Sequence, residues 1–235
     1  MENNRRNIIV SADDFGLSEK ANSSILELSS LGRIQRVSIL VDGKFEEEQL
    51  EQLASSGVRL DIHLDLPVKI LAPKGKASKH LPRMYNFLKF YFTGKNGREA
   101  VKSEWFRQME KFKELFGQVP DGITSHQHVH FFPAYLPVAI EFGKMSNDKY
   151  LRFFNKTPPQ LFGVVSFVLF VLGRKGRSAF VRSGLHSADY LLGLDWVNSL
   201  EEIQKMSAHG SVELVVHPEI DAEMKIVKEL FCDIL

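Results

Sequence analysis

Acidic, imidazole and guanidinium side chains recur at the ends of short apolar segments that are typical of strands. They are Asp13, Asp14, His63, His126, His128, His130, Arg152 and His217. One carboxylate and two neutral imidazoles can hold a divalent metal ion and leave a coordination position open for water or substrate. A second carboxylate beside such an ion can accept a proton. The residue types therefore indicate metal-assisted hydrolysis.

Each of these side chains also has an ordinary structural interpretation. Asp13 could cap the helix that follows it, and a single strand histidine is usually hydrogen bonded inside the core. The set as a whole fits this interpretation poorly, because several histidines packed into one core without a metal ion would be costly to desolvate. We therefore favour one shared site.

Apolar strands alternate with amphipathic helices along the chain, which indicates an α/β fold with parallel strands. Six strands are expected, at residues 7–12, 36–41, 58–66, 123–126, 150–154 and 212–217. Helices are expected at 19–31, 45–56, 99–116 and 134–145, after a Ser199–Glu202 capping box, and at the C-terminus. A (β/α) barrel and an open doubly wound sheet both fit this pattern. In either fold, ligands collect at the carboxyl ends of the strands.

Between residues 58 and 66, apolar and polar residues alternate strictly, which places Asp61 and His63 on one face of a strand. The polar set is therefore expected at one end and on one face of the predicted sheet.

Composition narrows the function classes. Thirty basic and 29 acidic residues leave a net charge of +1, which argues against a nucleic-acid partner. The single cysteine, Cys232, excludes a disulfide framework. The first residues lack the apolar core of a signal peptide, so a cytoplasmic location is expected. A length of 235 residues favours a single domain over 1–235.

Two further segments are unusual. Residues 161–172 form the longest apolar run, shorter than the ~20 residues of a membrane span, so we expect a buried helix. Contact with a membrane surface is the alternative, because basic residues follow it. Residues 67–98 form a basic, aromatic insert without acidic residues, expected either as a solvated cover of the site or as a lid that binds sugar rings and an anionic group.

Four segments together resemble the YdjC-like carbohydrate deacetylases, which include the chitooligosaccharide deacetylases. They are residues 8–18 with Ala-Asp-Asp-Phe-Gly, residues 61–64, residues 124–130 with His-x-His-x-His, and residues 213–218 with His-Pro. Two positions depart from the family pattern: asparagine is common where Ser11 stands, and glycine where Ile62 stands.

The resemblance implies a distorted TIM-like (β/α) barrel with seven strands, commonly a homodimer. It further implies one divalent ion, Zn²⁺ or Mg²⁺, and removal of an acetyl group from an N-acetylated amino sugar or glycoside. Carried over by position, the metal ligands are Asp14, His63 and His126, and Asp13 is the general base. His128 and His130 are expected to contact substrate. By similarity to the wider polysaccharide deacetylases, His217 is the general acid and Arg152 orients Asp13.

Two other functions fit the same residues: a non-catalytic sugar- or lipid-binding protein on the same scaffold, and a single-metal phosphodiesterase. The sequence contains no G-x-S-x-G elbow, phosphate-binding loop, H-E-x-x-H helix or G-x-G-x-x-G turn. These absences argue against serine hydrolases, P-loop NTPases, zincins and nicotinamide enzymes.

Overall fold

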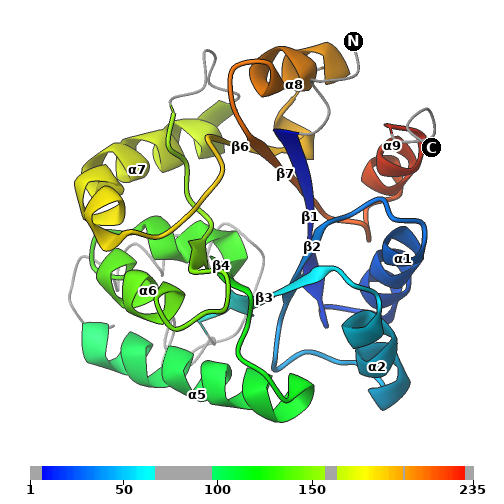
Figure 1. Cartoon of the computed structure of the whole chain (residues 1–235), viewed down its shortest axis with the longest axis horizontal. Coiled ribbons are helices and arrows are strands. Elements are labelled where there is room, and N and C mark those ends of the chain that lie inside the picture. The colour runs from blue at the N-terminus through cyan, green and yellow to red at the C-terminus, as the bar shows by residue number, and fades with distance from the viewer. Residues whose placement is uncertain (1–6, 67–96, 157–162, 198, 231–235) are drawn as a thin grey trace, which may run out of the picture.

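Seven parallel strands form one sheet that curls into a barrel-like shape (Figure 1). The computed structural model describes residues 7–66, 97–156, 163–197 and 199–230. The strands are β1 (Ile8–Phe15), β2 (Arg36–Ile39), β3 (Arg59–Leu64), β4 (Gly122–Ser125), β5 (Tyr150–Leu151), β6 (Tyr190–Gly193) and β7 (Val212–Val216). Their order across the sheet is β5-β4-β3-β2-β1-β7-β6, which is the chain order arranged in a ring.

The two edge strands, β5 and β6, are linked through the segment that leads into β6. The backbone N–H of Leu151 donates to the carbonyl of His186 at 3.1 Å, and that of His186 donates to Lys149 at 2.9 Å. The N–H of Lys156 donates to Asp189 at 2.8 Å. These bonds bring the edges of the sheet together, so the expected distorted TIM-like barrel is confirmed over the open doubly wound sheet.

Helices cover the outer side of the sheet and connect successive strands (Figure 1). They are α1 (Glu19–Ser30), α2 (Glu47–Ser55), α5 (Arg98–Phe116), α6 (Leu136–Gly143), α7 (Gly163–Ser183), α8 (Leu200–Ser207) and α9 (Asp221–Leu230), with 3-10 helices η2 (His126–Phe131) and η3 (Leu194–Trp196). Val37, Ile39, Ile62 and Leu64 are fully buried on the apolar face of the sheet. Burying one such side chain contributes about 1.5–3 kcal/mol, so the contact between sheet and helices stabilises the barrel.

The opposite face of the sheet is polar and lines the barrel interior. Its buried residues include Ser38, Asp61, His63, Arg152 and Glu213. Arg152 in the segment after β5 hydrogen bonds to Ser38 on β2 and to Glu213 on β7. Bonds between such distant strands form because the curled sheet turns its inner faces toward one another. Asp61 and His63 therefore share the polar face that their alternation predicts.

Most predicted elements occur near their predicted bounds, with three differences. The strand expected at 150–154 is observed only as the two residues Tyr150–Leu151. The sequence pattern missed β6, whose four residues are buried on both faces and therefore show no alternation of apolar and polar types. Ser199 occupies the N-cap position of α8, but its side chain makes no capping hydrogen bond, so that half of the predicted capping box does not form.

The apolar segment at 161–172 contributes the first half of α7, and its predicted burial is wrong for one face of the helix. Leu169 is buried, but Phe167 and Val168 are 53% and 44% exposed. In the part of the chain that the structure describes, none of the helices combines the length and apolarity of a bilayer crossing. The basic insert expected at 67–98 lies outside the described residues, apart from its last two.

Candidate metal centre and active site

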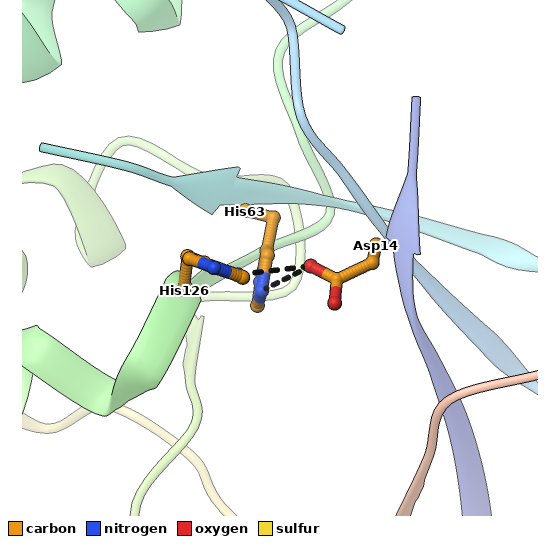
Figure 2. Close-up of side chains that lie close together, drawn as sticks. All are labelled: Asp14, His63 and His126. Atoms are coloured by element: carbon orange, nitrogen blue, oxygen red, sulfur yellow. Dashed lines mark hydrogen bonds and ion pairs between the residues drawn. The ribbon is translucent and has the colours of Figure 1, made fainter. Parts of the chain in front are cut away.

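Three side chains that are far apart in sequence converge at the carboxyl ends of the strands. Asp14 is near the end of β1, His63 is on β3, and His126 begins η2 directly after β4. Figure 2 shows both imidazoles directed at the same carboxylate oxygen of Asp14, at 3.0 Å for His126 Nδ1 and 3.4 Å for His63 Nε2. One ligand-type atom from each residue lies within 4.8 Å of the other two. One divalent cation could therefore contact all three.

Two consecutive carboxylates reach this centre because β1 is irregular near its end. Successive side chains of a regular strand point to opposite faces, so Asp13 and Asp14 would diverge. The pairing with β2 shifts register between Ala12 and Phe15, and Asp14 takes a left-handed backbone with φ of 70°. That conformation is unfavourable for a residue other than glycine. It lets both carboxylates approach His63 Nε2, which is 3.8 Å from Asp13.

Thr124 determines which nitrogen His63 presents to the carboxylates. The Thr124 hydroxyl donates to the carbonyl of Ile62 at 3.0 Å, and its oxygen is 2.7 Å from His63 Nδ1. Because the hydroxyl proton is already used, the oxygen accepts from Nδ1–H. This tautomer leaves the Nε2 lone pair free toward Asp14, which is how an oriented metal-binding imidazole is commonly held.

Arg152 binds the carboxylate of Asp13 through both of its terminal nitrogens. The distances are 2.6 Å from Nη1 and 2.8 Å from Nη2, and Arg152 is completely buried. A bidentate pair of this kind fixes the orientation of the carboxylate as well as its charge. The orienting role that the sequence gave to Arg152 is thus compatible with its geometry.

Glu213 holds the other side of the Arg152 guanidinium. Its carboxylate accepts from Arg152 Nε at 2.8 Å and from the Ser11 hydroxyl at 2.8 Å, and it also accepts from the Tyr150 hydroxyl. Burial and the charge of Glu213 raise the pKa of Tyr150, so the phenol stays protonated and can donate. Asp13 is therefore the end of a buried network that runs across the barrel from β7.

Both adjacent carboxyls are ionised at neutral pH. Burial by itself raises the pKa of Asp13, but the charge and hydrogen bonds of Arg152, together with the charges of His63 and His217, outweigh burial and hold it well below the ordinary value. Burial likewise raises the pKa of Asp14, and the neighbouring His126 and His63 together more than reverse this effect. Burial lowers the pKa of His126, but Asp14, with smaller contributions from the charges of Asp65 and Asp13, raises it above the ordinary value.

The formal charges inside the barrel fit a divalent cation. Four buried carboxylates face two guanidinium groups: Asp13, Asp14, Asp61 and Glu213 against Arg36 and Arg152. Arg36 binds Asp61 at 2.5 and 2.7 Å, and Arg152 binds Asp13 and Glu213. Two negative charges remain when His63 and His126 are neutral, because the charge of His217 is balanced by its ion pair with Glu223. Because uncompensated buried charge is unfavourable, the donor set and the charge both suit a dication at Asp14.

His217 follows β7 at the same end of the barrel, and Glu223 on α9 is its ionic partner. The Glu223 carboxylate accepts from the His217 backbone N–H at 2.7 Å and lies 3.7 Å from Nδ1 of its ring. Burial lowers the pKa of His217, but Glu223 and the charge of Asp13 outweigh it and raise the pKa to about 9. His217 is therefore protonated at neutral pH.

His128 lies in a strained turn beside the centre. Gln127 and His128 have φ values of 55° and 54°, in the left-handed region. The His128 ring lies 6.0 Å from that of Trp196 and 6.2 Å from that of Phe131, measured between centroids. Its Nδ1 is buried, and none of the described residues hydrogen bonds to it. Of the motif histidines, His128 is thus the one with a buried ring nitrogen that has no hydrogen-bond partner among the described residues.

His130 is fully buried, and both of its ring nitrogens have protein partners. Nε2 is 2.7 Å from the carbonyl oxygen of Arg152, and Nδ1 is 2.5 Å from the Ser125 hydroxyl. Since a carbonyl can only accept, Nε2 carries the proton and the hydroxyl donates to Nδ1. These contacts brace the backbone of Arg152 and leave neither nitrogen for a ligand.

Thr124, Glu213 and Glu223 support the site, and the sequence reasoning gave them no role. Glu213 had a detectable signal, because a carboxylate in the apolar strand Val212–Val216 requires a buried partner. Thr124 precedes the histidine motif on β4, where its hydroxyl is one of several plausible core donors. Glu223 lies on the amphipathic helix α9 and shows no local signal.

Fold and site together define an α/β barrel protein with a candidate divalent-metal centre at the carboxyl ends of its strands. The family described as YdjC-like protein matches residues 7–231. The chain belongs to this family, which confirms the resemblance inferred from its motifs.

Relatives of this chain carry deacetylase names. A carbohydrate deacetylase of Mus musculus is 30% identical over 148 residues, covering 58% of this chain and 47% of the relative. A chitooligosaccharide deacetylase of Proteus mirabilis (strain HI4320) is 32% identical over 145 residues, covering 58% and 55%. The matched region spans about half the length of these relatives.

A solved structure shares the fold over nearly the whole chain. It is that of a candidate cellobiose-phosphate cleavage protein from Enterococcus faecalis V583, with a TM-score of 0.62 and 19% identity. The alignment covers 96% of this chain and 94% of the other. At this identity the likeness establishes the architecture alone.

Proposed function

We propose that this protein is a metal-dependent amidohydrolase that removes the acetyl group from an N-acetylated amino sugar or glycoside. The convergence of Asp14, His63 and His126 beside the Arg152-bound carboxylate of Asp13 carries this proposal. The deacetylase names of the relatives support the choice of an acetamide substrate.

Asp14, His63 and His126 would hold the divalent ion. When bound, such an ion supplies Lewis-acid polarisation of the amide carbonyl and of a water molecule. Asp13 accepts the proton of the attacking water at its carboxylate, which the lowered pKa keeps ionised. Arg152 holds that carboxylate in one orientation through two hydrogen bonds. Correct positioning of a base contributes strongly to rate.

His217 is suited to act as the general acid. Its raised pKa, about 9, keeps the imidazole protonated at neutral pH, so it can donate a proton to the departing amine. Asp13 and His217 would thus begin the reaction in opposite protonation states, as a base and acid pair requires.

Substrate contact is proposed for His128, whose buried Nδ1 has no partner among the described residues. The same role for His130 stays a prediction, and its observed contacts support the backbone of Arg152 instead.

Several properties stay predictions alongside this function. Two imidazole ligands favour Zn²⁺ over Mg²⁺ by ligand type. A homodimer, a cytoplasmic location, a single domain over residues 1–235 and a lid formed by the insert at 67–98 follow from the sequence and the family resemblance.

Acetate release from diacetylchitobiose and other N-acetyl sugars tests the function. The protein is stripped of metal, reconstituted with Zn²⁺ or Mg²⁺, and compared with Asp13→Asn. Asp221→Asn is the matched control, since Asp221 is 88% exposed and pairs with Lys20 instead of Arg152. We expect activity in the wild type and the control, and a loss of about 10²–10⁴-fold in Asp13→Asn.

Two outcomes would favour the other functions. Binding of the sugars without acetate release by any reconstituted form would indicate a non-catalytic sugar-binding scaffold. Hydrolysis of a phosphodiester such as bis(p-nitrophenyl) phosphate, without acetate release, would indicate a phosphodiesterase. Among the described residues only one group of metal ligands is present, whereas phosphoryl transfer often uses two ions.

A further inference from the structure

The outward face of α7 is both apolar and basic. Phe167, Val168, Val171 and Val181 are 53%, 44%, 36% and 62% exposed. Arg174, Lys175, Arg177 and Arg182 are exposed on the same helix. At 100° per residue, these positions fall on one side of the helix, opposite the buried Leu169, Gly173, Gly176 and Phe180.

The inward side of α7 packs tightly against the barrel, so the helix cannot rotate to bury its outward face. A Cβ atom on Gly173 would lie 2.2 Å from the Phe154 ring, and one on Gly176 would lie 2.3 Å from Leu136. Phe180 stacks on Phe153 with ring centroids 4.6 Å apart. These close contacts leave the helix no room to rotate its exposed apolar residues inward.

The charge of this face has one sign. Residues 163–183 contain four cations and no acidic residue. In the described part of the chain, no carboxylate forms an ion pair with Arg174, Lys175 or Arg177, whereas other exposed cations such as Arg107 and Lys111 pair with acids. A helix with exposed apolar residues among unpaired cations suits the interface of an anionic bilayer. There the apolar side chains and the aliphatic parts of the lysine and arginine side chains enter the headgroup layer, and the cationic groups bind lipid phosphates.

We propose that the outward face of α7 binds the surface of an anionic lipid bilayer and docks the protein there without crossing it. The charge complementarity selects this occupant, since a second copy of the chain would bring four further cations against the first four. α7 packs against η2, which begins with His126, so docking would hold the candidate active site near the bilayer. The proposal does not depend on the chemistry of that site.

Vesicle co-sedimentation tests the proposal with the full chain. One set of vesicles contains phosphatidylcholine and phosphatidylglycerol in equal parts, and the other contains phosphatidylcholine alone. We expect binding to the anionic vesicles only, weakened by added salt because exposed charges are screened. Each cation near an anionic surface contributes about fivefold in partitioning, equivalent to about 1 kcal/mol. Arg174→Gln, Lys175→Gln and Arg177→Gln together should weaken binding on the order of a hundredfold.

A matched variant separates the α7 face from net charge. Lys144→Gln, Lys205→Gln and Lys225→Gln remove the same charge from exposed positions outside α7 and should leave binding unchanged. Phe167→Ser with Val171→Ser should also reduce binding, while circular dichroism shows an intact fold.

Three results would overturn the proposal. The first is no binding to anionic vesicles, and the second is binding that all the α7 variants retain. The third is a dimer by light scattering that Phe167→Ser converts to a monomer, because a second copy would then cover this face.

Discussion

Arg152 offers the sharpest test of the buried network, because it is completely enclosed and lies between two carboxylates. It bonds Asp13 at 2.6 and 2.8 Å and Glu213 at 2.8 Å. Arg152→Met keeps much of the side-chain length. It leaves the negative charges of Asp13 and Glu213 without their partner in the interior. Removing one partner of a buried ion pair costs about 3–5 kcal/mol. Against a total stability of about 5–15 kcal/mol, this loss should be large and easily measured.

Adding Glu213→Gln to Arg152→Met should restore part of the lost stability. The change at position 213 removes one of the two unpaired negative charges. The amide oxygen of the new glutamine can still accept a hydrogen bond from the Ser11 hydroxyl. Interaction energies between groups in one network are about 0.5–3 kcal/mol, so we expect the loss in the double variant to fall short of the summed losses of Arg152→Met alone and Glu213→Gln alone by about that amount.

Urea unfolding followed by tryptophan fluorescence measures these differences, with metal removed by a chelator so that ion binding does not shift the equilibrium. Trp105 is fully buried and reports on the core. Arg177→Met, at an exposed position, is the control and should stay within about 0.5 kcal/mol of the wild type. The reasoning is refuted if the two single losses simply add, or if Arg152→Met unfolds at the wild-type midpoint.

Three other predictions follow from individual contacts. Thr124→Val removes the oxygen that accepts the hydrogen bond of His63 Nδ1–H. It should lower the Zn²⁺ affinity about 10–100-fold, measured by calorimetric titration. An unchanged affinity would show that Thr124 does not orient His63. Gly43→Ala places a Cβ atom 2.4 Å from the carbonyl oxygen of Gly16, so it should destabilise the fold by about 1–3 kcal/mol, and an unchanged melting temperature would contradict this. His217 has a folded pKa raised to about 9, above the ordinary histidine value of about 6.5, so its stabilising contribution is complete below pH 6.5 and is lost as pH rises through 9. Unfolding free energies between these pH values should therefore fall more steeply for the wild type than for His217→Gln, and parallel curves would argue against the Glu223 contact.

The sequence predicted most elements of the fold because local patterning reflects burial. The helix expected at 19–31 is observed as Glu19–Ser30, and the strand expected at 212–217 as Val212–Val216. A helix or strand with one buried face repeats apolar residues at its own period, and this repeat is visible without knowledge of neighbours. The sequence pattern missed β6 for the same reason, because a strand buried on both faces has no repeat of apolar and polar residues.

The sequence also placed the polar set at one end of the barrel. Parallel strands joined by helices carry their carboxyl ends to one side, so Asp14, His63 and His126 were expected to be near one another. Their family motifs further narrowed the chemistry to a metal centre.

Tertiary structure alone decided which atoms meet. The turn of Asp14 toward His63 depends on a register shift between β1 and β2, and the tautomer of His63 depends on a hydroxyl 61 residues away. Likewise, Glu213 reaches Arg152 across the barrel from a strand 61 residues later. Periodicity is a local property of the chain, whereas the partner of a buried polar group is set by the register and curvature of strands that are distant in sequence.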